Sequence, residues 1–129
     1  MPGRSTGHLQ EAALAASKAV NSLLQNKLGR RDVSEVKLVR EAFTDKPAKV
    51  GAPRLRFYAI EDEQTRDSMR DGAMNFGAGC FRAIRNPVGH LPNEEHELTE
   101  QQALERLAAW SLFARWIDEA EVVICGEAE

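Results

Sequence analysis

One short stretch of the chain collects the residue types that phosphate and proton chemistry require. Residues 81–90 read FRAIRNPVGH, so Arg85, Asn86 and His90 fall within six positions. The planar guanidinium group of arginine donates hydrogen bonds to a phosphate and stabilises negative charge that develops on it. Histidine titrates near neutral pH and can transfer protons. These three residues form a candidate catalytic site, and Arg82, one helical turn earlier, is either a second phosphate ligand or an ordinary surface arginine.

The same stretch is also typical of a helix end. Pro87 disfavours the helical conformation at Asn86, so the preceding helix is expected to end near Ile84 or Arg85. Cations near a helix C-terminus interact favourably with its dipole, and asparagine is a common C-terminal cap. Arg85, Asn86 and His90 would then stabilise a helix end without chemistry. The residues alone leave both interpretations open.

The single histidine in this stretch limits how the stretch could cleave a phosphodiester bond. RNA supplies its own nucleophile, the 2′-hydroxyl, so its cleavage needs a base, an acid and a cation but no metal or cofactor. In-line transfer places the acid and the base on opposite sides of the phosphate, and the stretch contains one histidine, His90. Two chains related by a twofold axis would supply two histidines and two arginines. We therefore expect a homodimer with a shared site.

Four helical segments are expected to position this stretch. Apolar residues at spacings of three and four predict helices over about 5–28, 34–43, 61–84 and 99–120. Their links favour an all-α antiparallel bundle, a single domain over 1–129 with a core over about 6–123. The last helix is apolar on two faces, one with Leu104 and Leu112 and one with Trp110 and Phe113. The second face favours self-association.

Three glycines and two short segments predict further features of the fold. Gly72, Gly77 and Gly79 lie inside the third helix, where each is unfavourable, so they favour close helix packing there. Residues 54–57 alternate polar and apolar side chains, but one such piece does not make a sheet. Residues 122–124 are expected to continue the last helix or to fray.

Charged residues elsewhere offer weaker candidates for RNA contact. His8 and Glu11 on the first helix are candidates to reach the site around Arg85. Four arginines, Arg30, Arg31, Arg54 and Arg56, are expected to be scattered surface charge, with an RNA-facing rim as the alternative.

Composition limits the possible partners. The 129 residues carry a net charge of −3, so bulk charge does not make the chain a polyanion binder. No apolar run is long enough for a signal peptide or a membrane span. Cys80 and Cys125 lack the spacing of a metal site, and a reducing cytoplasm is the expected location.

Arg85-Asn86-Pro87-Val88-Gly89-His90 resembles the signature of the HEPN superfamily: an arginine, a polar residue, a short spacer and a histidine at the end of a bundle helix. The chain further resembles the Ymh-like branch, which is found in bacterial and phage-defence settings. Residues 7–12, 72–90 and 104–120 carry that likeness. Gly89 departs from the branch, which more often has alanine there.

The resemblance implies a dimeric helical bundle with a metal-independent endoribonuclease site at the dimer interface. It makes Arg85 and His90 the catalytic pair and Asn86 the residue that orients the site. It also implies RNA as the substrate and an antitoxin or defence protein as a partner. Because some superfamily members bind without cutting, a non-catalytic interaction or nucleotide-binding module is the alternative.

Overall fold

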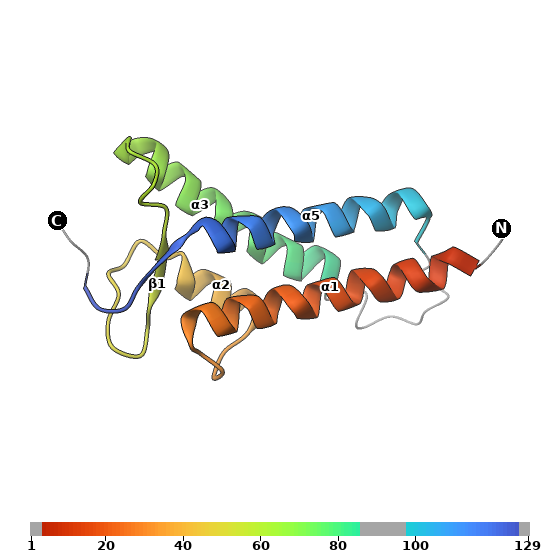
Figure 1. The fold of residues 1–129 in the computed structure, drawn as a ribbon, viewed down its shortest axis with the longest axis horizontal. Helices are drawn as coiled ribbons and strands as arrows, with labels where there is room; N and C mark the ends of the chain where they lie inside the picture. The colour runs from red at the N-terminus through yellow and green to blue at the C-terminus, as the bar shows by residue number, and fades with distance from the viewer. Residues whose placement is uncertain (1–3, 86–97, 127–129) are drawn as a thin grey trace.

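Three long helices and one short helix make up most of the computed structural model, which describes residues 4–85 and 98–126 (Figure 1). The elements in chain order are α1 (Arg4–Leu28), α2 (Glu35–Ala42), β1 (Arg54–Arg56), α3 (Glu63–Cys80), the π-helical turn η1 (Phe81–Arg85), α5 (Glu100–Glu119) and β2 (Glu121–Val123). The expected all-α bundle is confirmed. Helix α3 runs opposite to α1 and α5, which therefore run in the same direction (Figure 1).

Helix α1 buries one stripe along its length. Every third or fourth residue faces the core, at Ala13, Ser17, Val20, Leu24 and Leu28. Gly29 follows with φ +68°, the left-handed conformation that commonly ends a helix. Near this end, Lys27 Nζ donates to the carbonyl oxygens of Ile117 and Asp118 at 2.7 and 2.9 Å. This lysine satisfies carbonyls in the last turn of α5 and fixes the two helices in parallel.

Helix α5 begins with the expected capping box. The Thr99 hydroxyl accepts from the Gln102 backbone N–H, and the Gln102 side chain accepts from the Thr99 N–H. Trp110 and Phe113 are buried in the core, where the Trp110 ring packs edge-on against Phe81 at 4.8 Å between ring centroids. Of the two apolar faces expected on α5, the second, with Trp110 and Phe113, is the core face. The face with Leu104 and Leu112 stays in solvent, where Leu104 is 50% and Leu112 40% exposed.

Only one of the three glycines in α3 is explained by close packing. A Cβ at Gly77 would overlap the Phe113 ring, so this glycine lets α5 approach α3. Gly72 and Gly79 have open space where a Cβ would lie. The expectation of close packing is therefore wrong for those two positions.

A two-stranded ribbon closes the other end of the bundle and corrects two expectations. Residues 54–56 pair antiparallel with 121–123, in the register Arg54 with Val123 and Arg56 with Glu121. Residues 122–124 therefore neither continue α5 nor fray. The sequence signal was ambiguous because each strand is three residues long, and pairing between distant segments cannot be read from local alternation.

The ribbon also buries two arginines that were expected on the surface. Arg54 and Arg56 are 6% and 5% exposed. Arg54 donates to the carbonyl oxygens of Lys46 and Glu41, and Arg56 donates to that of Lys46 at 2.8 Å. Their guanidinium groups satisfy a carbonyl in the last turn of α2 and one in the loop that follows it. The interpretation of these two residues as surface charge or as an RNA-facing rim is wrong.

Candidate functional site

The candidate site begins on a change of helix type. Helix α3 passes directly into the π-helical turn η1, whose residues contact α1, α2 and α3. Single π-helical turns are rare and occur frequently at functional sites. The wider π winding moves residues three apart off a shared face. Arg82 accordingly lies exposed while Arg85 is partly buried, and no contact within the described residues brings them together.

Among the described residues, Arg85 faces one carboxylate, across the gap to α2. Its Nε lies 3.5 Å from Oε2 of Glu35, and the two side chains are 24% and 32% exposed. That separation places opposite charges in contact but is too long for a good hydrogen bond. The Nε atom is itself buried and has no hydrogen-bond acceptor. The exposed parts of both side chains can still meet a further polar group.

Glu35 is held in an unusual backbone conformation. Its φ is +55°, the left-handed region, and no other non-glycine residue among those described has a positive φ. Its backbone N–H donates to Oδ1 of Asn21 on α1 at 2.7 Å. The Ser34 side chain, which precedes it at the N-cap, makes no capping hydrogen bond. Asn21 thus fixes the residue that faces Arg85, and three segments of the chain converge here.

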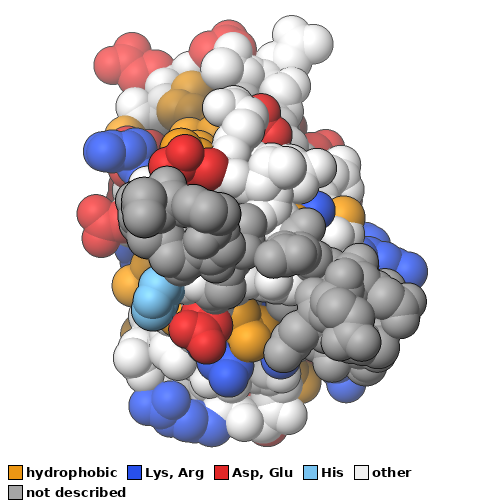
Figure 2. Space-filling model, turned by 90° about the vertical axis from the view of Figure 1, so that its right-hand side faces the viewer, with side chains coloured by type: hydrophobic (Ala, Val, Ile, Leu, Met, Phe, Trp, Pro, Cys, Tyr) orange, Lys and Arg blue, Asp and Glu red, His pale blue; other side chains and the backbone are white. Residues whose placement is uncertain are grey.

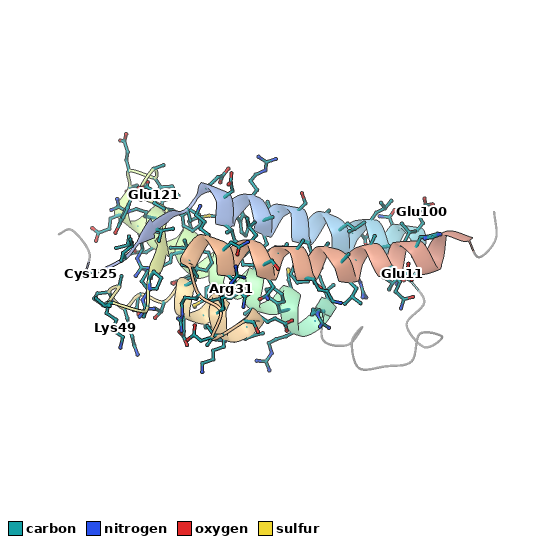
Figure 3. The ribbon with its side chains drawn as sticks, turned by 60° about the horizontal axis from the view of Figure 1, so that its bottom comes forward. Glu11, Arg31, Lys49, Glu100, Glu121 and Cys125 are labelled. Carbon is teal, nitrogen blue, oxygen red and sulfur yellow. The ribbon has the colours of Figure 1, made fainter. Side chains whose placement is uncertain are left out.

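The remaining predicted site residues divide into two groups. Asn86 and His90 lie outside the described residues, as does the turn between them. His8 and Glu11 lie exposed on α1. Figure 3 shows Glu11 toward the start of α1, at the same end as Glu100. No contact within the described residues joins His8 or Glu11 to Arg85, and the α1 residue that reaches the Glu35–Arg85 pair is Asn21.

A family comparison covers almost all of this architecture. The model of a family described as "Protein of unknown function (Hypoth_ymh)" matches residues 4–117. The chain belongs to this Ymh family. The matched Ymh region runs from α1 into α5 and includes Asn21, Glu35 and Arg85. No curated protein matches the chain, and no solved structure does so either.

Other charges in the Ymh region are more fully paired than Arg85. Arg30 donates to both carboxylate oxygens of Asp32, at 3.1 and 2.7 Å, and also to Glu41. These hydrogen bonds, with that to Asp32 the strongest cause, raise the pKa of Arg30. On the face shown in Figure 2, basic side chains are scattered among acidic ones and do not form a continuous patch. Arg30 is therefore a structural tie between the link before α2 and α2 itself.

The acidic, histidine and cysteine side chains of the Ymh chain bear on metal and thiol chemistry. Within residues 4–85 and 98–126, no group of three or more His, Cys, Asp or Glu side chains could hold a metal ion. Cys80 is buried, and this burial raises the pKa of its thiol to about 11. The Cys80 thiol therefore stays protonated at neutral pH and packs as a small apolar side chain. No helix in the same ranges is long and apolar enough to cross a membrane.

Sequence reasoning missed Glu35 and Asn21. A glutamate in the first turn of a helix is ordinary, because it complements the helix dipole. An asparagine in the polar positions of a long helix is equally unremarkable. Neither the positive φ of Glu35 nor its contact with Arg85, 50 positions later in the Ymh chain, leaves a local pattern in the sequence.

Proposed function

We propose that the chain is a metal-independent endoribonuclease of the HEPN type, with Arg85 as its phosphate ligand. The observation that carries the proposal is the state of Arg85. Its guanidinium lies partly exposed on a π-helical turn, faces one carboxylate at 3.5 Å, and has a buried Nε without an acceptor. An arginine in this state can accept a phosphate without breaking a set of structural hydrogen bonds.

In the proposed mechanism the 2′-hydroxyl oxygen of the RNA attacks the adjacent phosphorus. A bond forms between that oxygen and phosphorus, and the bond to the 5′-oxygen breaks. One histidine accepts the proton from the 2′-hydroxyl and another protonates the leaving 5′-oxygen. Arg85 neutralises the charge that develops on the phosphoryl oxygens. The products are a 2′,3′-cyclic phosphate and a 5′-hydroxyl. His90 is the proposed proton carrier, contributed once by each protomer.

The homodimer needed to supply two copies of His90 has a candidate surface. Leu104 and Leu112 leave apolar area exposed on α5. The neighbouring helix α1 exposes three small apolar residues, at Ala12, Ala15 and Ala19. Because α1 and α5 pack side by side, these positions offer an apolar surface on which a second copy could pack closely. We place the dimer contact there.

A non-catalytic module is the competing function, and the Arg85–Glu35 pair is also the observation that favours it. An ion pair between η1 and α2 can serve as a structural tie. In that case the chain binds a partner protein or a nucleotide and cuts nothing. The proposed biological setting is a cytoplasmic bacterial defence or toxin system with an antitoxin or defence protein as partner.

Incubation of the purified full chain with cellular RNA tests the proposal. We expect the wild type to release fragments with cyclic phosphate ends in the presence of EDTA. Arg85→Ala and His90→Ala should each lower the cleavage rate at least ~100-fold. Arg40→Ala serves as the matched control, because Arg40 is an exposed arginine on α2. Cleavage by Arg85→Ala at the wild-type rate, or no cleavage by the wild type, would overturn the nuclease proposal.

A further inference from the structure

Glu35 creates a difficulty for an arginine that must bind phosphate. Its carboxylate lies 3.5 Å from Arg85 Nε and is exposed enough to meet whatever Arg85 binds. A plain phosphate placed against the guanidinium would be repelled by this second anion. The repulsion falls if the ligand itself presents a hydrogen-bond donor to the carboxylate. The pair therefore discriminates among ligands according to what stands next to their phosphate.

A ribonucleotide has this combination of groups. Its 2′-hydroxyl is a hydrogen-bond donor close to the 3′-phosphate, whereas DNA has no such donor. We propose that, in the bound RNA before cleavage, Glu35 accepts the hydrogen bond of the ribose 2′-hydroxyl while Arg85 binds the adjacent phosphate, so that this pair selects RNA over DNA. The hydroxyl then turns from Glu35 to the histidine that takes its proton during cleavage. The inference rests on the proposed function and adds the group that sets its substrate class.

Two observations favour this role over a simple tie between helices. The first is the separation, since a structural ion pair gains most when its atoms are within hydrogen-bond distance, as in the Arg30–Asp32 pair at 2.7 Å. The second is the positive φ of Glu35, which is unfavourable for a residue with a Cβ and is maintained by the Asn21 hydrogen bond. Strained backbone of this kind clusters where a side chain must be held for function.

Binding of two matched oligonucleotides tests the inference. One probe is a fluorescent single-stranded RNA, and the other has the same sequence with 2′-fluoro sugars, which keep the RNA-like sugar shape but lack the hydroxyl donor. All proteins carry His90→Ala so that the RNA stays intact during fluorescence anisotropy measurements. Without a further change, we expect the protein to bind RNA roughly tenfold more tightly than the 2′-fluoro probe.

Substitution of Glu35 should remove that preference. Glu35→Ala deletes the acceptor, so the ratio of the two affinities should fall to about one, while Glu35→Gln retains one acceptor oxygen and should keep part of it. Glu41→Ala is the matched control, since Glu41 lies on the same helix, is 33% exposed and also pairs with an arginine. This control should leave the ratio unchanged.

The possible results separate the two proposals. If Glu35→Ala weakens both probes equally and leaves the ratio unchanged, Glu35 only positions Arg85 and the inference is overturned. If Arg85→Ala leaves the binding of both probes unchanged, the proposed function itself fails and the inference fails with it. If Arg85→Ala weakens both probes and Glu35→Ala removes the preference, both are supported. Circular dichroism melting of each variant establishes that it is folded.

Discussion

Arg30 and Arg85 contact carboxylates at opposite ends of the short helix α2. Arg30 meets Glu41 near the C-terminal end and is also held by both oxygens of Asp32, and its side chain is 11% exposed. Arg85 meets Glu35 at the N-terminal end, at 3.5 Å, and is 24% exposed. The residue types are the same, but the geometry differs. The first arginine has its hydrogen-bonding capacity used by the fold, and the second retains capacity for a ligand.

The ribbon arginines extend this comparison. Arg54 and Arg56 are nearly inaccessible, and both donate to backbone carbonyls of the chain itself. Removing such a group leaves buried acceptors without donors, which costs far more than removing a solvent-screened ion pair. Arginine content alone therefore indicates little about nucleic-acid binding in this chain. The number and length of each arginine's contacts separate structural arginines from available ones.

The largest expected difference is in stability between Arg54→Met and Arg85→Met. Arg54→Met should lower the free energy of unfolding by about 2–4 kcal/mol, because the Glu41 carbonyl loses its Arg54 donor, the Lys46 carbonyl keeps only Arg56, and a nearly inaccessible guanidinium is replaced. Arg85→Met should cost less than about 1 kcal/mol, since its one ion pair is long and partly solvated. Urea unfolding measures both, with Arg40→Met as the exposed control. If the two variants lose equal free energy of unfolding, Arg85 is a structural residue like Arg54, and the distinction between structural and available arginines fails.

A smaller effect is expected from relieving the backbone at Glu35. Glu35→Gly and Glu35→Ala both remove the carboxylate, but only glycine adopts φ +55° without steric cost. The glycine variant should therefore be more stable than the alanine variant by about 1 kcal/mol. Thermal unfolding followed by circular dichroism compares them. Alanine matching glycine in stability would mean that the Glu35 backbone relaxes when the side chain is gone, and would weaken the case for a strained, functional position.

The smallest effect concerns the pH dependence of the Arg30 tie. The hydrogen bond from Arg30 lowers the pKa of Asp32 below its ordinary value near 4. A carboxylate with a lowered folded-state pKa adds stability above that ordinary value and loses it as the pH falls through the folded pKa. Asp32→Asn should therefore flatten the fall in stability below pH 4, measured by urea unfolding across pH 2–7. A slope identical to that of the wild type would mean that Arg30 relies on Glu41 alone.

The helical part of the fold followed from the sequence because its determinants are local. The apolar spacing of α1 and α5, the Gly29 stop and the Thr99–Gln102 capping box are each contained within a few residues. The ribbon was missed because its two strands lie about 65 positions apart, so their pairing leaves no local signal in either segment. The burial of Arg54 and Arg56 follows from that pairing, so it was missed for the same reason.

The site was predictable only in part. Arg85 could be selected from its place before Asn86 and Pro87, but its partner Glu35 gives no local signal. The π-helical turn likewise depends on how η1 packs against α1 and α2, and it separates Arg82 from Arg85 where an α-helical spacing would bring them together. Asn86 and His90 remain predictions from the sequence.

The parallel packing of α1 and α5 has a consequence for the order of folding. The first helix in the chain has its most extensive packing against the last, so its apolar stripe stays only partly covered, by α2 and η1, until about residue 119 has been synthesised. Contacts of such large sequence separation slow folding, because a long loop must close before they form. The nascent chain must therefore keep α1 soluble for most of translation. The alanines in the first half of α1 expose little apolar surface and favour an isolated helix. This half of α1 is therefore suited to stay helical and soluble before α5 has been synthesised.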